Sequence, residues 1–457
     1  MGVPSLWRIL QPVKKEVYLS ELSGYKIAID LNTWIVECKL CTAYKNIYLR
    51  NVFLRTIEFL INGIEPIFVI DGRIPELKDS TVHKRRKISY NQECIPPIRR
   101  ERSRSITSQK CLTLLKYLGA TCFASNGEAE ALCAQLNAEE VVDACFSSDS
   151  DILLYGAQKV YRNYSKINKQ CLLESISAKN VFNEFGLEQR SLICLALLIG
   201  CDYDSQGVKG IGSKYALMLL EELKLKNVDA LERILCWRSN AELQTLAKTK
   251  EEFIKSRHCQ QCMHKVHHHS KIGCKKCRMK KVAIKNCVCF CHETVQKLKL
   301  HEMELIVREK ALLNPDFPSK KIISEFLDSK QIYDAKENIT WKEPDIENLC
   351  KFFVENLFWS AENFFLTMVP LLIYWKLNSY PYRFLDDLKP QRILQKCKRN
   401  HQQVYEVEWS KIKENWTKLK VYTSFVDIKK FTACFPTMAE KFEESISAVA
   451  EQKASED

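Results

Sequence analysis

The chain has 457 residues, a formal net charge of +13 and 21 cysteines. This length supports two or three domains with hydrophobic cores. No apolar run is long enough to span a bilayer and the first residues show no secretory signal pattern, so we expect no membrane association. Cysteines without such a signal favour a reducing compartment, with thiols or metal sites rather than disulfides. The positive charge favours an anionic partner, with nucleic acid first.

The first 72 residues predict a strand–helix–strand unit of a parallel sheet. The apolar run from Lys26 to Leu31 places Asp30 at its end, and the run from Pro66 to Gly72 places Asp71 at its end. Apolar residues at helical spacing lie between them, over residues 49–60. Ligand sites in such sheets lie beyond the carboxyl ends of the strands. We therefore expect both aspartates at a functional edge.

Two close pairs of acids follow, Glu128 with Glu130 and Asp149 with Asp151. The aspartates come after a short predicted strand, and side chains two positions apart on an extended chain face the same way. The glutamates stand at the entry to a predicted helix, where acids are tolerated and can converge. Four carboxylates forced together require a cation, and oxygen ligands favour Mg²⁺ or Mn²⁺. A solvated acidic surface is the ordinary alternative, and the repetition of acids at strand ends argues against it.

Residues 78–110 carry ten Lys or Arg against three acids, a net charge of +7. A proline pair and little apolar periodicity predict a loop there. Such charge runs are usually solvated loops, but this one lies next to a strand-end aspartate. We therefore favour a phosphate-gripping element, in which the run from Lys84 to Lys87 contacts DNA without reading its sequence.

A glycine hairpin is the next candidate site. Asp202 directly follows an apolar helix, in a position where a carboxylate rarely stands without a role. Three glycines and two lysines then precede another helical run, and their backbone amides and ammonium groups can hold one phosphate of a duplex strand. These residues are Gly207, Lys209, Gly210, Gly212 and Lys214.

The ordered motifs MGVPSLW, AIDLNTW, FVIDGRIPELK, NGEAEALCA, SSDSD, IGCDYD and GVKGIGSKYA carry a specific resemblance. The chain resembles the flap-endonuclease (xeroderma group-G) superfamily over about residues 1–237, and within it the GEN-type Holliday junction resolvases. The resemblance implies an α/β, parallel-sheet PIN-like nuclease core with a helical arch and a helix-two-turn-helix. A helical segment and a small chromodomain-like module of strands and helices are expected to follow.

The resemblance also implies the residue roles. Two Mg²⁺ (or Mn²⁺) ions would be held by Asp30, Asp71, Glu128, Glu130, Asp149, Asp151 and Asp202. The basic pair of the arch falls on Lys78 and Arg85 as catalytic residues, and Gly2 is expected to approach the DNA. The charge run adds Lys84, Arg86 and Lys87 to the expected DNA contacts. A K⁺ ion is expected at the glycine hairpin. Val36 stands where flap endonucleases place a stacking tyrosine, so base stacking is either absent or done by another residue.

Residues 258–292 hold seven of the 21 cysteines and six of the nine histidines. The pairs Cys259/Cys262 and Cys274/Cys277 have chelating spacing and suit structural Zn²⁺. The alternative is a thiol-rich basic insertion without metal. Soft ligands do not suit magnesium, so the catalytic ions are not expected here.

The predicted domains are a nuclease core over 1–257, the Cys/His-rich insertion over 258–292, a helical extension over 293–380 and the chromodomain-like module over 390–450. Within the core, the arch covers about 73–110 and the helix-two-turn-helix about 200–225. The module offers Tyr405, Trp409 and Trp416 for an aromatic cage that would read methyl-lysine. We favour a DNA-contacting platform instead.

The expected function is a magnesium-dependent, structure-specific DNA endonuclease that resolves Holliday junctions and cuts 5′ flaps in recombination and repair. Expected partners are four-way junctions, 5′ flaps and replication forks, and the expected location is the nucleus. A junction has two equivalent cut sites, so we expect a monomer in solution that forms a dimer on junction DNA. The alternatives are a 5′-flap endonuclease without junction resolution and a catalytically silent junction-binding protein.

Overall fold

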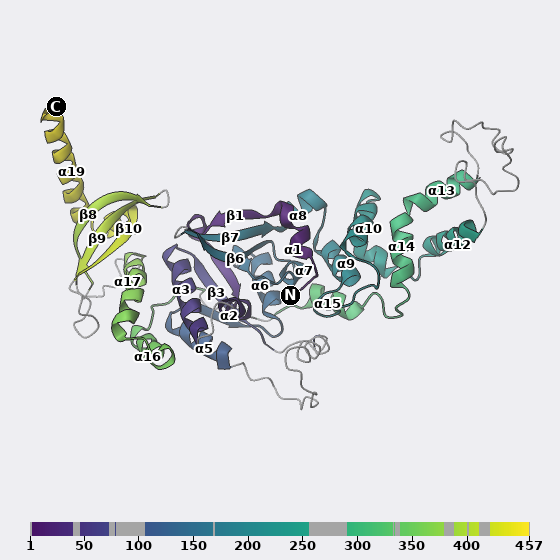
Figure 1. Ribbon diagram of the computed structural model, residues 1–457, viewed down its shortest axis with the longest axis horizontal. Coiled ribbons are helices and arrows are strands. Elements are labelled where there is room, and N and C mark those ends of the chain that lie inside the picture. Colours follow the sequence, from purple (N-terminus) through teal and green to yellow (C-terminus); the bar gives the residue numbers. More distant parts are fainter. Residues whose placement is uncertain are drawn as a thin grey trace.

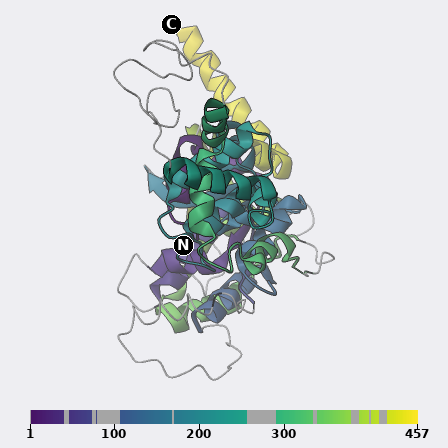
Figure 2. The ribbon, with the colours of Figure 1, turned by 90° about the vertical axis from the view of Figure 1, so that its right-hand side faces the viewer.

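The computed structural model describes residues 2–39, 46–72, 78, 106–167, 170–255, 290–331, 333, 339–378, 388–399, 402–410 and 421–456. The molecule is elongated, with a large sheet in the middle, helices α12–α14 at one end and a small sheet at the other (Figure 1). Helix α19 projects beyond the small sheet (Figure 1), and the view along the long axis shows the C-terminal end of this helix at the top of the molecule (Figure 2). Among the helices described, none is long and apolar enough to cross a membrane.

The large sheet has seven strands in the order β1-β7-β6-β5-β2-β3-β4. Their bounds are β1 Lys15–Tyr18, β2 Lys26–Asp30, β3 Glu65–Ile70, β4 Thr121–Ala124, β5 Ala144–Phe146, β6 Lys159–Ile167 and β7 Gln170–Ser177. Strands β6, β5, β2, β3 and β4 run parallel, which confirms the predicted parallel core. Strand β7 is antiparallel to β6, because only two residues separate them and a parallel return needs a long crossover. Strand β1 pairs antiparallel with β7 at the edge of the sheet.

The sheet separates two hydrophobic cores. Ile27 and Ile29 of β2 face one core and Ala28 faces the other, because successive side chains on a strand point to opposite faces. On the Ala28 side the helices are α1 Leu6–Ile9, α6 Ala129–Ala138, α7 Asp151–Leu154, α8 Ala178–Phe185, α9 Gln189–Ile199, α10 Ser213–Leu225, α11 Ala230–Leu235, α14 Glu302–Ala311 and α15 Lys320–Asp328. Helices α12 Ala241–Lys255 and α13 Phe290–Leu300 continue the chain at that end of the molecule.

The opposite core is rich in aromatic side chains. Its helices are α2 Leu31–Lys39, α3 Ile47–Ile61, α5 Ile106–Tyr117, α16 Ile346–Leu357 and α17 Ala361–Asn378. Trp34 is fully buried, and its ring makes edge contacts with Phe59, Phe68 and Phe146 at centroid distances of 5.2, 5.4 and 5.6 Å. Such aromatic contacts favour one packing geometry. They hold α2 against the sheet directly after Asp30.

The small sheet has the order β10-β9-β8 and is antiparallel. Its elements are β8 Pro390–Arg399, β9 Gln402–Ser410 and β10 Val421–Asp427, followed by α18 Ile428–Cys434 and α19 Pro436–Glu456. A small sheet followed by helices confirms the expected module of strands and helices. Tyr405 and Trp409 are core residues that pack on Phe431. They are therefore unavailable for an open aromatic cage, which removes the main support for a methyl-lysine reader.

Candidate active site

The parallel strands bring the predicted acids to one edge of the sheet. Asp30 ends β2, Asp71 directly follows β3, and Glu128 is the N-cap of α6 after β4. Asp149 follows β5, and Asp202 follows α9. Six of the seven acids are at most 9% exposed: Asp30, Glu128, Glu130, Asp149, Asp151 and Asp202. Buried carboxylates without compensation destabilise a fold, so their gathering points to a bound cation.

The geometry of the cluster fits divalent cations. Carboxylate oxygens of Asp71, Glu128 and Glu130 lie within 4.8 Å of one another. Glu128 Oε1 and Asp151 Oδ1 are buried and have no hydrogen-bond partner among the residues described. Buried polar atoms are almost always satisfied. These two oxygens are therefore available as ligands for a hard cation such as Mg²⁺ or Mn²⁺.

The electrostatics of the cluster lead to the same conclusion. Burial, and then the charge of Asp71, raises the pKa of Asp30 to about 7. Burial and the neighbouring Asp30 raise the pKa of Glu130 well above its ordinary value. Burial and Asp149 do the same to the pKa of Asp151. The cluster resists full ionisation by itself, and bound cations would favour the ionised form.

Neutral side chains orient the first two aspartates. The backbone N–H of Asn32 donates to Asp30 Oδ1 at 2.9 Å, and its side-chain amide donates to Asp71 Oδ2 at 2.6 Å. Thr33 donates to Asp30 from both its backbone and its hydroxyl. The Ala129 amide donates to Asp71 Oδ1 at 2.8 Å. Asn32 and Thr33 both lie inside the AIDLNTW motif, but neither is among the site residues predicted from the sequence.

The second acid pair converges in a different way from the prediction. Ser150 has helical angles, φ −77° and ψ −18°, and Asp151 begins α7, so the segment is a turn and not an extended chain. The Asp149 amide donates to Ser147 Oγ at 3.1 Å, and the Asp151 amide donates to Asp149 Oδ1 at 3.1 Å. Local hydrogen bonds from Ser and Asp side chains stabilise such turns. Asp149 and Asp151 therefore lie close together as predicted, but the predicted reason, the alternation of side chains along an extended strand, is wrong.

Gly2 lies directly against the acids. Its backbone N–H donates to Asp202 Oδ1 at 3.1 Å, and its φ is +81°. A Cβ at this position would lie 2.6 Å from Asp151 Oδ1 and closer still to Asp149 Oδ1 and Ser150 Oγ. Only glycine fits this approach. The predicted DNA contact of Gly2 stays a prediction, but its place beside the site is a structural fact.

The side chain of Lys78 places a positive charge among the acids. Its Nζ is 2.7 Å from Glu128 Oε2 and 3.5 Å from Asp202 Oδ2, and its side chain is 16% exposed. Burial works to lower the pKa of Lys78, but the charges of Glu128, Glu130 and Asp202 and the hydrogen bond to Glu128 together outweigh burial and raise it. The ammonium therefore stays charged. Several predicted residues lie outside the described part of the chain: Lys84, Arg85, Arg86, Lys87, Cys259, Cys262, Cys274 and Cys277.

The glycine hairpin has the strained backbone that its glycines allow. Gly207 has φ +54°, and a Cβ there would lie 2.5 Å from the backbone N of Gly200. Gly210 has φ +77°, and Gly212 is the N-cap of α10. Lys209 and Lys214 are exposed. Phosphate and potassium binding at the hairpin stay predictions.

Two residues complete the account of the sequence predictions. Val36 lies on α2 and is 47% exposed, so the position of the stacking tyrosine is open to solvent. From the sequence, α15 is expected only as part of a helical extension. In the structure, Glu325 of α15 lies within 3.4 Å of Tyr203, the neighbour of Asp202. No local pattern around residue 325 signals this contact.

Comparisons with known proteins agree with the fold. The model of the XPG N-terminal domain matches residues 1–92, and that of the XPG I-region matches residues 119–202. The flap endonuclease GEN homolog 1 of Mus musculus is 31% identical over 431 residues, which cover 90% of this chain and 46% of the relative. The flap endonuclease GEN-like 1 of Arabidopsis thaliana is 31% identical over 81% of this chain and 67% of its own length. The chain thus spans about half the length of the mouse relative.

Among solved structures, human GEN1 in complex with Holliday junction DNA matches with a TM-score of 0.68 at 23% identity, over 99% of this chain and 100% of that chain. The sheet, its helices and the acids at the strand ends define a nuclease fold of the XPG class. The chain belongs to the XPG superfamily, in the branch of the GEN-type flap endonucleases. The resemblance and the fold class predicted from the motifs are confirmed.

Proposed function

We propose that the protein is a structure-specific DNA endonuclease that hydrolyses phosphodiester bonds in branched DNA. The observation that carries this proposal is the convergence of seven carboxylates and one lysine at the edge of the sheet, where two buried carboxylate oxygens have no partner among the described residues. A protein that only bound junctions would have little reason to keep buried acids that destabilise the fold without metal.

The acids are suited to hold two divalent cations, Mg²⁺ or Mn²⁺. When bound, such ions supply an activated water and stabilise the leaving oxygen. The hydrogen bonds from Asn32 and Ala129 fix the carboxylate oxygens of Asp71 before substrate arrives. Lys78 carries a positive charge beside Glu128 and Asp202, where it can neutralise charge on the scissile phosphate. Arg85 is proposed to act with it from the arch.

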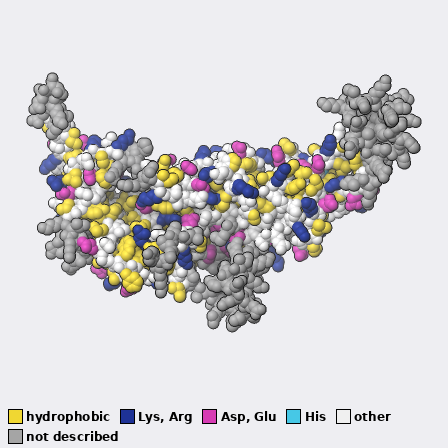
Figure 3. Space-filling view, in the orientation of Figure 1, with side chains coloured by type: hydrophobic (Ala, Val, Ile, Leu, Met, Phe, Trp, Pro, Cys, Tyr) yellow, Lys and Arg dark blue, Asp and Glu magenta, His cyan; other side chains and the backbone are white. Residues whose placement is uncertain are grey.

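The proposed substrates are four-way junctions, 5′ flaps and replication forks. The similar human protein is in complex with Holliday junction DNA, and the relatives are called flap endonucleases. Lys and Arg side chains occur along the whole length of the face in Figure 3 and do not gather in one patch. This distribution suits a DNA partner that touches several parts of the elongated protein. We further propose action in the nucleus, where this DNA lies.

Resolution of a junction needs two incisions at symmetric positions, and one chain supplies one acid cluster. Two copies must therefore meet on the junction, most simply with two-fold symmetry. A flap has one cut site and needs one copy. A flap endonuclease without junction resolution is the second candidate, because the names of the relatives support it directly.

The test maps the products of flap DNA and of a junction held in a supercoiled cruciform, with and without magnesium, over a range of protein concentrations. We expect flap cleavage by one copy and paired junction cuts that depend on a second copy. Asp149→Asn should bind both substrates and lose cleavage by several orders of magnitude. Cleavage by this variant at the wild-type rate would refute the assignment. A single junction nick at every protein concentration would favour the flap endonuclease.

A further inference from the structure

The segment from α15 to Gln331 lies outside both family-model matches, yet it contacts the site from two directions. Helix α15 begins at the N-cap Ser319, whose hydroxyl accepts from the Ile322 amide. Its apolar side is buried through Ile322, Ile323 and Phe326. This burial fixes the helix against the core and leaves its polar side chains to face the site or the solvent.

The first contact between α15 and the site is made through two tyrosines. The hydroxyls of Tyr155 and Tyr203 lie 2.6 Å apart, and each is 3.4 Å from Glu325 Oε1. Phe326 packs its ring edge-on against both, at centroid distances of 5.0 Å to Tyr155 and 5.4 Å to Tyr203. Two adjacent residues of α15 therefore hold both rings, one through an apolar contact and one through a carboxylate.

The tyrosine pair in turn contacts Lys78. The ammonium of Lys78 lies 5.9 Å from the centroid of the Tyr203 ring, within range of a cation–π contact. Lys78 also bridges Glu128 and Asp202, and Tyr203 directly follows Asp202 in the chain. The position of the Tyr203 ring therefore determines one wall of the space in which Lys78 sits.

The second contact between this segment and the site is made with the loop before Glu128. The Asn126 amide donates to Gln331 Oε1 at 2.8 Å, and the Gln331 amide donates to Gln135 Oε1 at 2.7 Å. Asn126 is two residues before Glu128, the other partner of Lys78. The same short segment thus contacts the chain on both sides of the lysine.

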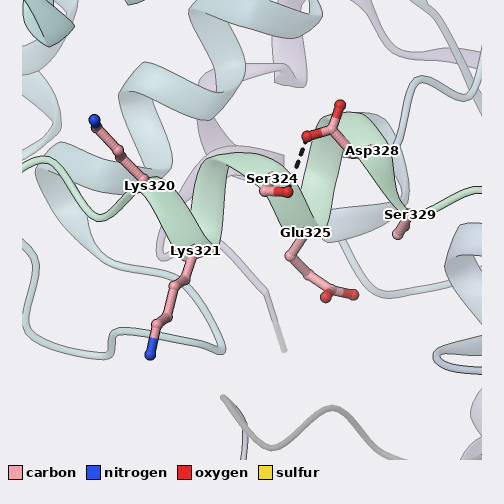
Figure 4. A pocket seen from close by; sticks show the side chains of 6 residues that line it. All are labelled: Lys320, Lys321, Ser324, Glu325, Asp328 and Ser329. Atoms are coloured by element: carbon pink, nitrogen blue, oxygen red, sulfur yellow. Dashed lines mark hydrogen bonds between the residues drawn. The ribbon is translucent and has the colours of Figure 1, made fainter.

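Glu325 has features that stability alone does not explain. Its carboxylate is half-buried and makes no ion pair with a basic side chain among the residues described. It lines an open hollow of about 480 Å³, and Figure 4 shows it extending from the same side of the helix as Lys321. An apolar residue would pack on the two rings at a lower desolvation cost. Each hydroxyl has one proton, so one hydroxyl donates to the other and the second has its proton left to donate to Glu325. The carboxylate thus supplies the acceptor that the tyrosine pair lacks.

We propose that Glu325 is a positioning residue for DNA cleavage, which holds the Tyr155–Tyr203 pair so that Lys78 stays between Glu128 and Asp202. The inference rests on the proposed function and adds a residue from outside the two family-model matches. Glu325 contacts the tyrosines and acts through them, so it sets the rate of the chemical step and not the affinity for DNA.

The test measures the single-turnover cleavage rate and the DNA dissociation constant on a 5′ flap. A small misplacement of a charged group reduces rates by up to about a hundredfold, so we expect Glu325→Ala to lower the rate about ten- to a hundredfold. The dissociation constant should stay within about twofold, because no DNA contact is removed. Glu325→Gln keeps an acceptor oxygen and should restore most of the rate. Failure of this rescue would overturn the proposal.

Asp328→Ala is the matched control, because Asp328 is an exposed acid on the same helix that points away from Glu325 and bonds only Ser324 in Figure 4. It should cleave at the wild-type rate. In a Lys78→Ala background, Glu325→Ala should cause little further loss, because both changes remove one interaction. Fully additive losses, or a Glu325→Ala rate within twofold of wild type, would overturn the proposal. No cleavage by the wild-type protein would count against the proposed function instead.

Discussion

Asp30→Asn should stabilise the protein in chelator at pH 8 and abolish cleavage. The pKa of Asp30 is raised from its ordinary value of 3.8 to about 7, first by burial and then by Asp71. At 1.36 kcal/mol per pKa unit, ionising this group in the metal-free fold costs about 4 kcal/mol. Because the folded pKa lies above the unfolded one, stability from this group is fully present below pH 3.8 and is lost as pH rises through about 7.

The Asn side chain fits the position of Asp30. Its single oxygen can accept from the amides of Asn32 and Thr33, as Asp30 Oδ1 does now. Its NH₂ group would face the hydroxyls of Thr33 and Ser147, which can turn to accept. The substitution therefore removes a charge without leaving an obvious unpaired donor. We expect a net gain of about 2–4 kcal/mol at pH 8 in chelator, after the loss of charge-assisted hydrogen bonds.

Urea unfolding at pH 5.5 and pH 8, with chelator and with magnesium, measures this effect. In chelator, the advantage of the variant should shrink as pH falls, because wild-type Asp30 then takes up its proton. Magnesium should stabilise the wild type more than the variant, because the variant has lost a ligand. A variant that is less stable than wild type in chelator at pH 8 would refute the electrostatic reasoning.

Two further predictions concern glycine and lysine residues. Gly2→Ala should lower single-turnover cleavage about a hundredfold or more by displacing the chain from Asp149. Gly24→Ala is the control, because Gly24 also has a positive φ, +90°, but nothing near its Cβ among the described residues, and this variant should cleave normally. Equal effects of the two substitutions would contradict the clash. Replacing Lys209 and Lys214 by Ala should reduce the slope of log affinity against log salt by about 2, as salt titration of DNA binding would show, and an unchanged slope would remove both lysines from the contact set.

The sequence by itself determined the core of this protein and the identity of its acids. Asp30 and Asp71 each follow an apolar run that reads as a buried strand, and ligand sites in parallel sheets lie at the strand ends. That rule depends only on local pattern and on the handed geometry of strand–helix–strand units. The rule can therefore be applied to a sequence without any knowledge of tertiary contacts. The same holds for Glu128 at a helix start.

Only the tertiary structure decided how the acids are held. The Gly2 amide reaches Asp202 across 200 positions of the chain, and Lys78 reaches Glu128 across 50. Glu325 reaches Tyr203 across 122 positions, from a helix whose local pattern reads as ordinary amphipathic packing. Hydrogen bonds and ion pairs of this kind depend on where distant elements dock, and periodicity in one segment carries no information about its partner. The acids could be identified from the sequence, whereas the residues that hold them in place could be identified only from the tertiary structure.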